Sequence, residues 1–241
     1  VRADGSAPYS SARTFEELDL GDALLQGVYA MKFERPSKIQ AASLPVILGT
    51  EPRSLIAQGH NGSGKTACFV LAMLSRVDPA VESPQALCLA PTREVARQIK
   101  EVTETIGKYL KVRVYLAVPA TDAQKKVSTR LGVDAVREQI VVGTPGRVLD
   151  MTKRKTIDTK RMKIFVLDEA DQMVATSGLG DTTIRVKRNL PQNVQTVLFS
   201  ATYSDDVRRI AEAVAPGADQ IQIKKEELSL EKVKQYYFKC N

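Results

Sequence analysis

Seven short runs of apolar and β-branched residues alternate with helical patterns along this chain, and the alternation limits the folds open to it more than any other feature. The runs cover residues 54–57, 86–89, 112–117, 139–142, 164–167, 196–199 and 220–223. Strands that alternate with helices are joined by βαβ crossovers, which produce a parallel sheet covered by helices on both faces. We therefore predict an α/β fold in which ligands bind where strands end and helices begin.

The composition narrows the class of protein. The chain has 241 residues, of which 43% are hydrophobic, and this suits one large α/β domain or two small ones. No apolar stretch approaches the roughly 20 residues needed to cross a bilayer, and residues 1–13 are polar and small, so we expect a soluble intracellular protein without membrane contact. Cys68, Cys88 and Cys240 are scattered and do not cluster with His60, which excludes a disulfide framework and a zinc site.

The net charge of +7 favours a polyanionic partner, although an excess of lysine and arginine is more often a solubility trait. Both ends of the chain look cut, because it starts at Val1 and stops at Asn241 inside a strand-like run that begins at Gln235. We expect a flexible segment over residues 1–13, one domain over 14–223, and over 224–241 a linker and the start of a missing second domain. For residues 224–234, a solvated final helix is an equally good interpretation.

Residues 59–66 fit the pattern GxxxxGKT, after one predicted strand and before a predicted helix over 65–76. Glycines here let backbone N–H groups close on phosphate oxygens at a helix N-terminus, where the helix dipole favours an anion. Lys65 is expected to hold the β- and γ-phosphates, and the hydroxyl of Thr66 to face a metal ion. The predicted nucleotide-binding residues of this loop are Gly59, His60, Asn61, Gly62, Ser63, Gly64, Lys65 and Thr66, with His60 interpreted as a spacer.

Asp168 and Glu169 follow the apolar run 164–167, so they also lie at the carboxyl end of a predicted strand. We predict that Asp168 holds Mg²⁺, partly through water, and that Glu169 polarises the attacking water as general base. The structural alternative is an acidic turn that caps the next helix, because Asp and Glu are favoured in a first helical turn. Together with the phosphate loop, the two carboxylates favour a magnesium-dependent nucleotide hydrolase.

Six motifs occur in the order typical of one family. Besides the phosphate loop, they are RPSKIQ at 35–40, PTREVA at 91–96, TPGR at 144–147, DEAD at 168–171 and SAT at 200–202. The chain resembles the first RecA-like domain of a DEAD-box RNA helicase. The resemblance implies a three-layer RecA-like P-loop NTPase fold with a mostly parallel central sheet, ATP and Mg²⁺ as cofactors, and catalytic roles for Lys65, Asp168 and Glu169.

By this resemblance, Phe33 and Gln40 select ATP over other nucleotides. An aromatic ring can stack on the base, and an amide can both donate to and accept from an adenine edge. Without the other motifs, Phe33 would be read as a core residue and Gln40 as an exposed helix residue. Phe15, farther upstream, either supports this pocket or only packs in the core.

A candidate RNA site comes from residues at helix starts after strands, where hydroxyl, backbone N–H and guanidinium groups can grip phosphates without reading sequence. The resemblance places single-stranded RNA at Thr92, Arg93, Thr144, Gly146 and Arg147. The structural alternative is that Thr92 and Thr144 only cap helices, and we expect capping in addition.

A coupling role is implied for the turn that follows the run 196–199. Ser200 and Thr202 are expected to hydrogen-bond to the loop 168–171, which includes Asp171, and so to couple hydrolysis to strand separation. A turn of small polar residues is the structural alternative.

Segments 25–31, 70–75, 165–173 and 234–237 resemble the branch of the family that acts in mRNA export at the cytoplasmic face of the nuclear pore. The resemblance implies a monomer that binds RNA or mRNP, a nuclear-pore protein and an activator with inositol hexakisphosphate, in the cytoplasm and nucleus. Lys32 and the pair Pro119 and Ala120 depart from glycines that are usual in the family, and proline removes an N–H that RNA could contact.

Without the arginine-bearing motifs of a second domain, we expect this piece to hydrolyse ATP very slowly, since transition-state charge lacks its arginine finger. The alternative function is an ATP-gated module that binds RNA or a nucleoporin without productive unwinding.

Overall fold

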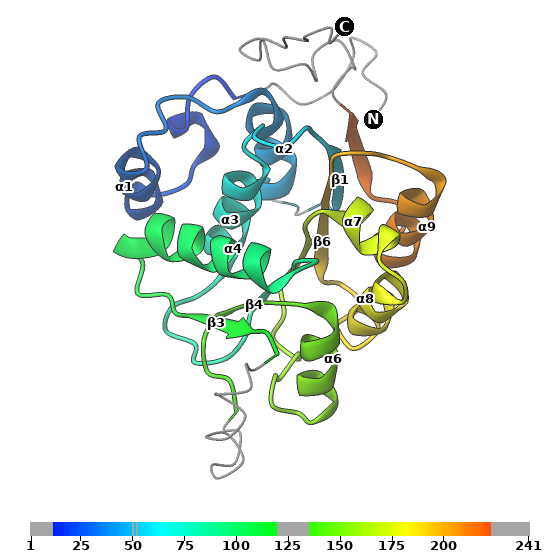
Figure 1. Cartoon of the computed structure of the whole chain (residues 1–241). Coiled ribbons are helices and arrows are strands. Elements are labelled where there is room, and N and C mark those ends of the chain that lie inside the picture. Colours follow the sequence, from blue (N-terminus) through cyan, green and yellow to red (C-terminus); the bar gives the residue numbers. More distant parts are fainter. Residues whose placement is uncertain (1–11, 50, 52, 120–134, 223–241) are drawn as a thin grey trace, which may run out of the picture.

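The computed structural model describes residues 12–49, 51, 53–119 and 135–222, and a seven-stranded sheet runs through them (Figure 1). The strands are β1 (Leu55–Gln58), β2 (Ala86–Leu89), β3 (Val114–Ala117), β4 (Ile140–Gly143), β5 (Ile164–Leu167), β6 (Gln195–Ser200) and β7 (Asp219–Gln222). Their order is β3-β4-β2-β5-β6-β1-β7, and all neighbouring pairs are parallel. All seven predicted strands are confirmed, with ends displaced by at most two residues.

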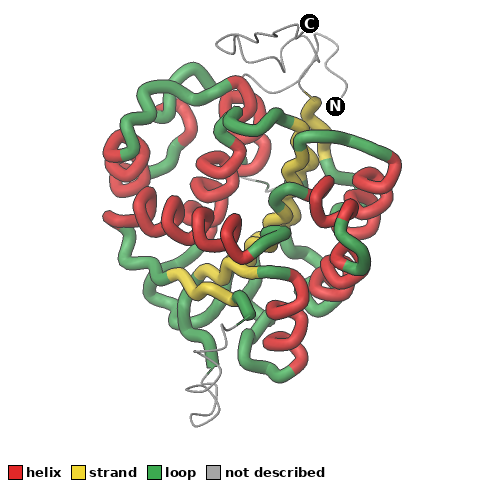
Figure 2. Tube along the Cα trace, in the orientation of Figure 1, coloured by secondary structure: helices red, strands yellow, loops and turns green. Residues whose placement is uncertain are grey.

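Helices cover both faces of the sheet, so that the strands in Figure 2 pass between two groups of helices. One layer holds η1 (Glu16–Leu18), α1 (Asp22–Ala30), α2 (Lys38–Leu48), α3 (Lys65–Arg76), α4 (Arg93–Ile106) and η2 (Gly107–Tyr109). The other holds α6 (Pro145–Lys153), α7 (Ala170–Ala175), α8 (Leu179–Lys187) and α9 (Asp205–Val214). Alternate strand residues contribute to the two cores, which is why β2 and β5, in the middle of the sheet, are apolar at every position.

Helix α2 holds the N-terminal part of the described chain in place. Its first turn is closed by a capping box, in which the side chains of Ser37 and Gln40 each accept from the other's backbone N–H. Pro45, inside the helix, has no N–H, so the carbonyl of Ala41 lacks its helical donor. The N–H of Ala12 donates to that carbonyl at 3.2 Å. The proline that weakens the helix therefore creates an attachment point for the chain before it.

The C-terminal end of α2 is tied to α3, the helix that follows the phosphate loop. The guanidinium of Arg76 donates to the carbonyls of Ile47, at 2.6 Å, and Gly49, at 3.4 Å. The side-chain amide of Gln195 donates to the same Ile47 carbonyl at 2.9 Å. These bonds satisfy carbonyls that a helix leaves without intrahelical partners at its end.

The N-terminal boundary differs slightly from the predicted division at residue 14. Ala12 is buried, and the backbone N–H of Arg13 donates to a carboxylate oxygen of Glu17 at 2.8 Å, so both residues contact the domain. Residues 1–11 and the predicted linker and strand over 224–241 lie outside the described residues. None of the helices in the described ranges combines the length and apolar character that a membrane span requires.

Candidate nucleotide-binding site

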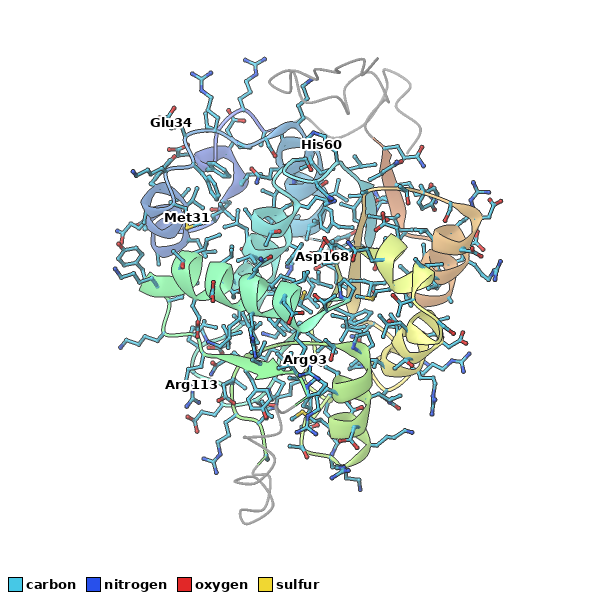
Figure 3. All side chains as sticks on the ribbon, viewed as in Figure 1. Met31, Glu34, His60, Arg93, Arg113 and Asp168 are labelled. Carbon is cyan, nitrogen blue, oxygen red and sulfur yellow. The ribbon has the colours of Figure 1, made fainter. Side chains whose placement is uncertain are left out.

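The motifs converge because neighbouring parallel strands end at the same level. Gln58 of β1 pairs with Ser200 of β6, and Leu89 of β2 pairs with Leu167 of β5. The phosphate loop, the SAT turn, the acidic pair and the start of α4 therefore share the carboxyl edge of the sheet. Figure 3 shows Asp168 near the middle of this face, with Met31, His60 and Arg93 around it.

The phosphate loop is shaped by two glycines with positive φ, Gly62 at +79° and Gly64 at +93°. L-residues rarely adopt this conformation, whereas glycine does so without steric cost. The side chain of Lys65, at the start of α3, is 7% exposed. Its Nζ donates to the carbonyl of Gly59 at 2.8 Å and to Oδ1 of Asn61 at 3.3 Å. The loop therefore supplies the acceptors for the lysine in this structure.

Asp168 is a buried carboxylate, 4% exposed, directly after β5. One of its oxygens accepts from the backbone N–H of Glu169 at 3.0 Å. Burial, reinforced by the Glu169 carboxylate, raises the pKa of Asp168 to about 7, against the opposing influence of Lys65. Burial lowers the pKa of Lys65, although the three nearby carboxylates favour its charged form. A buried carboxylate whose cost of burial is only partly offset by a neighbouring positive charge is typical of a functional site.

Glu169 has a left-handed backbone, with φ of 51° and ψ of 50°. A non-glycine residue in this region costs on the order of 1–3 kcal/mol, and such strain clusters at active sites. Its Oε2 is buried without a hydrogen-bond partner. Burial raises the pKa of Glu169, Lys65 lowers it, and Asp171 raises it further. The raised pKa makes this carboxylate a better proton acceptor, as a general base requires.

A cavity of about 320 Å³ lies between the phosphate loop, the acidic pair and the segment after α1. Among the described residues it is lined by Met31, Phe33, Asn61, Gly62, Gly64, Lys65, Thr66, Ala67, Val102, Asp168 and Glu169. Eight of these were predicted from sequence. Gly59, His60, Ser63 and Gln40 were predicted too but do not line it.

Three lining residues were missed. Val102 lies in the third turn of α4 and Ala67 in the first turn of α3, and both are ordinary apolar helix positions without a motif. Met31 could have been found, because it lies two residues before Phe33, in the turn that follows α1.

Gln40 is buried, so the alternative interpretation of this residue as an exposed helix residue is wrong. Its Oε1 accepts from the N–H of Ser37 at 2.9 Å, and its Nε2 donates to the carbonyl of Gly64 at 2.9 Å. One N–H and one lone pair of the amide are left by these bonds for a further partner. The side chain thus joins the capping box of α2 to the phosphate loop.

Phe33 both lines the cavity and packs on the core, so the two interpretations of this residue coexist. Lys32 before it has φ of 59°, in the left-handed region. This backbone explains why a glycine is favourable at the position, and the chain bears an added cost of about 1 kcal/mol with lysine there. Phe15 is fully buried and is absent from the cavity lining, so it packs in the core.

The SAT turn is bonded to both the phosphate loop and the acidic motif. The N–H and the hydroxyl of Thr202 both donate to Oδ2 of Asp171 at 3.2 Å, as predicted. The prediction for Ser200 was wrong, because its hydroxyl is buried without a partner. Its backbone carbonyl instead accepts from the N–H of Gly59 at 3.0 Å. The contact runs through the backbone because β1 and β6 are paired up to this residue.

The candidate RNA residues lie at two adjacent strand ends. Thr92 caps α4, with its hydroxyl accepting from the N–H of Val95 at 3.2 Å. Thr144 occupies the corresponding position before α6 but makes no side-chain cap bond, so the prediction of capping is right for Thr92 and wrong for Thr144. Proline at the first position of α6 already lacks one of the N–H groups that a cap would satisfy.

The remaining candidates sit close by in α6. Gly146 is exposed, and Arg147 donates to Oδ2 of Asp150 at 3.2 Å. Pro119 is exposed just beyond β3, whereas Ala120 lies outside the described residues. Exposed, polar helix starts at one edge of the sheet suit contacts to a phosphate backbone.

The donor set fits Mg²⁺ carried by a nucleotide. A hard cation prefers oxygen ligands, and Mg²⁺ commonly uses one or two carboxylates together with substrate phosphates. The partnerless Oε2 of Glu169 and the buried carboxylate of Asp168 are such oxygens, with the hydroxyl of Thr66 in the same cavity. No group of three or more His, Cys, Asp or Glu able to hold a metal occurs among the described residues.

Comparison with known proteins agrees with this geometry. The profile of the DEAD/DEAH box helicase family matches residues 37–210, which is most of the chain. The chain belongs to this family. The predicted family is thereby confirmed, and the members of the family use ATP. DEAD-box proteins among the solved structures share its architecture, which also confirms the RecA-like fold.

Among the similar DEAD-box helicases is the ATP-dependent RNA helicase Dbp5 of Schizosaccharomyces pombe. It is 49% identical over 240 residues, which cover 100% of this chain and 46% of that protein. The chain thus spans about half the length of the curated relatives it matches. A structure of Saccharomyces cerevisiae Dbp5 bound to RNA and ADP BeF3 has a TM-score of 0.84 at 48% identity, covering 93% of this chain and 55% of that one.

Another structure shows a Saccharomyces cerevisiae Dbp5 variant bound to Nup159, a Gle1 variant, IP6 and ADP. Its TM-score is 0.78 at 49% identity, and the match covers 84% of this chain and 52% of that one. The predicted likeness to the mRNA-export branch therefore extends over the whole chain and not only over the four segments that indicated it.

Proposed function

We propose that this chain is the ATP-binding half of an ATP-dependent RNA helicase that remodels RNA or RNA–protein complexes. The observation that carries the proposal is the cavity that the phosphate-loop lysine, Lys65, lines together with the buried Asp168 and the half-buried Glu169. A glycine-lined loop and two carboxylates in one cavity match the parts needed for phosphoryl transfer to water.

Each residue has a role that follows from its place. Lys65 would exchange its bonds to the loop for bonds to phosphate oxygens, and the N–H groups at the start of α3 would bind the same anion. Asp168 and the hydroxyl of Thr66 would hold Mg²⁺, which supplies charge neutralisation of the phosphates when bound. Glu169 would orient the attacking water and accept its proton. Phe33, which lines the cavity, would stack on the adenine. Gln40 does not line the cavity in this structure, and its remaining N–H and lone pair are proposed to meet the edge of the base once nucleotide is bound.

RNA is the proposed activating ligand, held at Thr92, Arg93, Thr144, Gly146 and Arg147. The likeness to Dbp5 bound to RNA supports this assignment. The Asp171–Thr202 bonds and the backbone bond from Gly59 to Ser200 join the acidic motif, the SAT turn and the phosphate loop, and we propose that this connection makes nucleotide state and RNA binding depend on each other.

Further partners are proposed from the same likeness. Dbp5 binds Nup159 and Gle1 with IP6 in a solved structure, and we propose an analogous nuclear-pore protein and activator for the whole protein, together with a role in mRNA export between nucleus and cytoplasm. Isolated residues 1–241 are expected to bind nucleotide weakly, bind RNA poorly and turn over very slowly, since the family's second domain contributes the arginine finger.

The test is an ATPase titration with single-stranded RNA on the full-length protein. RNA-stimulated phosphate release is expected, and Glu169→Gln should abolish it while leaving nucleotide binding intact. Lys65→Ala should remove both binding and turnover. RNA-independent turnover, or none in the wild type, would favour the ATP-gated binding module instead.

A further inference from the structure

Helix α1 and the C-terminal end of α4 touch through their backbones, and the contact depends on Gly27. A methyl group on Gly27 would lie 1.9 Å from the carbonyl oxygen of Ile106 and 2.8 Å from its carbonyl carbon. Both are backbone atoms, so no side-chain rotation can relieve the clash. Reaching the 3.4 Å of ordinary contact would require α1 to move by about 1.5 Å.

The glycine is there for this contact and not for its backbone angles. Gly27 is inside a regular helix and is absent from the residues with positive φ. Glycine in a helix interior costs about 1 kcal/mol relative to alanine, so propensity alone favours replacing it. The close approach of the two helices is the feature of the structure that excludes a side chain.

The residues that follow α1, Met31 and Phe33, connect this contact to the nucleotide site. The carbonyl of Gly27 accepts from the N–H of Met31 at 3.3 Å, and the carbonyl of Val28 accepts from the N–H of Phe33 at 3.3 Å. Met31 and Phe33, which follow α1, form the apolar end of the cavity lining together with Ala67 of α3 and Val102 of α4. The position of α1 on α4 therefore fixes the width of the apolar end of the cavity.

We infer that Gly27 is a positioning residue for nucleobase recognition: by letting α1 dock on the Ile106 carbonyl, it sets Met31 and Phe33 at the distance from α4 that a purine ring requires. The inference rests on the proposed function, because it assumes that the apolar end of the cavity receives the base. Gly27 should affect binding of the base and not binding of the phosphates, because the phosphate loop is held by β1, α3 and Gln40 and not by α1.

The test compares MgADP with magnesium tripolyphosphate, which offers the phosphates without a base, by calorimetry on residues 1–241. Base stacking contributes roughly 1–3 kcal/mol, so Gly27→Ala is expected to weaken ADP binding about tenfold. Tripolyphosphate binding should stay within about twofold of wild type. A residue that only stabilised the fold would lower both affinities together. Gln26→Ala, an exposed substitution on the same helix, is the matched control and should change neither.

A double-mutant cycle sharpens the result. In a Phe33→Ala background the base contact is already lost, so adding Gly27→Ala should weaken ADP binding little further. Equal tenfold losses in both backgrounds, or an unchanged ADP affinity in Gly27→Ala, would overturn the inference while leaving the proposed function standing. A wild-type chain that binds ADP no better than tripolyphosphate would overturn both.

If Gly27→Ala does not fold, the same two affinities are measured for Tyr29→Phe instead. The hydroxyl of Tyr29 donates to the Glu16 carboxylate and holds α1 from its exposed side. Its loss should lower the ratio of ADP to tripolyphosphate affinity about twofold or more, and a ratio equal to that of wild type would overturn the inference.

Discussion

Replacing Asp168 by asparagine is expected to stabilise the nucleotide-free chain at pH 8, although it removes a residue of the proposed catalytic site. The pKa of this buried carboxyl rises from its ordinary 3.8 to about 7 on folding. Between about pH 4 and pH 7, the carboxyl of Asp168 is therefore still protonated in the folded state but already ionised in the unfolded state. Stability must fall as the pH rises from about 4 to about 7, and the full cost is present above pH 7.

The size of the effect follows from the same values. At about 1.4 kcal/mol per pKa unit, a rise from 3.8 to about 7 corresponds to about 4 kcal/mol. This net value already includes the attraction between Asp168 and the buried Lys65, which lowers the pKa of Asp168. We expect Asp168→Asn to be more stable than wild type by about 2–4 kcal/mol at pH 8, and by little at pH 4.

Urea unfolding with a chelator present, at several values between pH 4 and pH 8, measures the difference. Other carboxylates titrate in both proteins, so the difference between the two curves isolates Asp168. A difference that is independent of pH, or a variant less stable than wild type at pH 8, would refute the argument from burial. Asp168 therefore belongs among the residues that are retained for function at a cost in stability.

Three further substitutions test the local structure by urea unfolding. Lys32→Gly should stabilise the chain by about 0.5–1 kcal/mol by relieving the left-handed backbone, and no change would show that φ of 59° carries no strain. Arg76→Ala should destabilise it by about 2–3 kcal/mol, because the buried Ile47 carbonyl loses a charged donor, whereas a loss under 0.5 kcal/mol would contradict that role. Thr92→Val should cost about 1 kcal/mol and Thr144→Val clearly less, since only the first hydroxyl caps its helix; equal costs would argue against the assignment.

The sequence predicted the elements of the site better than their contacts. The strands and α3 were predicted because a buried parallel strand is apolar at every position, and the loop glycines because phosphate binding needs their backbone. The contact of Thr202 with Asp171 was predicted as well. By contrast, whether the hydroxyls of Ser200 and Thr144 find a partner depends on the exact position of each side chain at its strand end, and both lack the predicted bond. A motif does not encode such positions.

By itself, the sequence determined the parallel sheet, the phosphate loop after β1 and the acidic pair after β5, because these rest on periodicity and on residue types that act over a few positions. Only the tertiary structure decided that Met31 and Val102 complete the cavity, that Gln40 turns to the Gly64 carbonyl, and that α1 meets α4 at Gly27. The physical reason is that these contacts join segments far apart in the chain, and their geometry is set by how whole helices pack on the sheet.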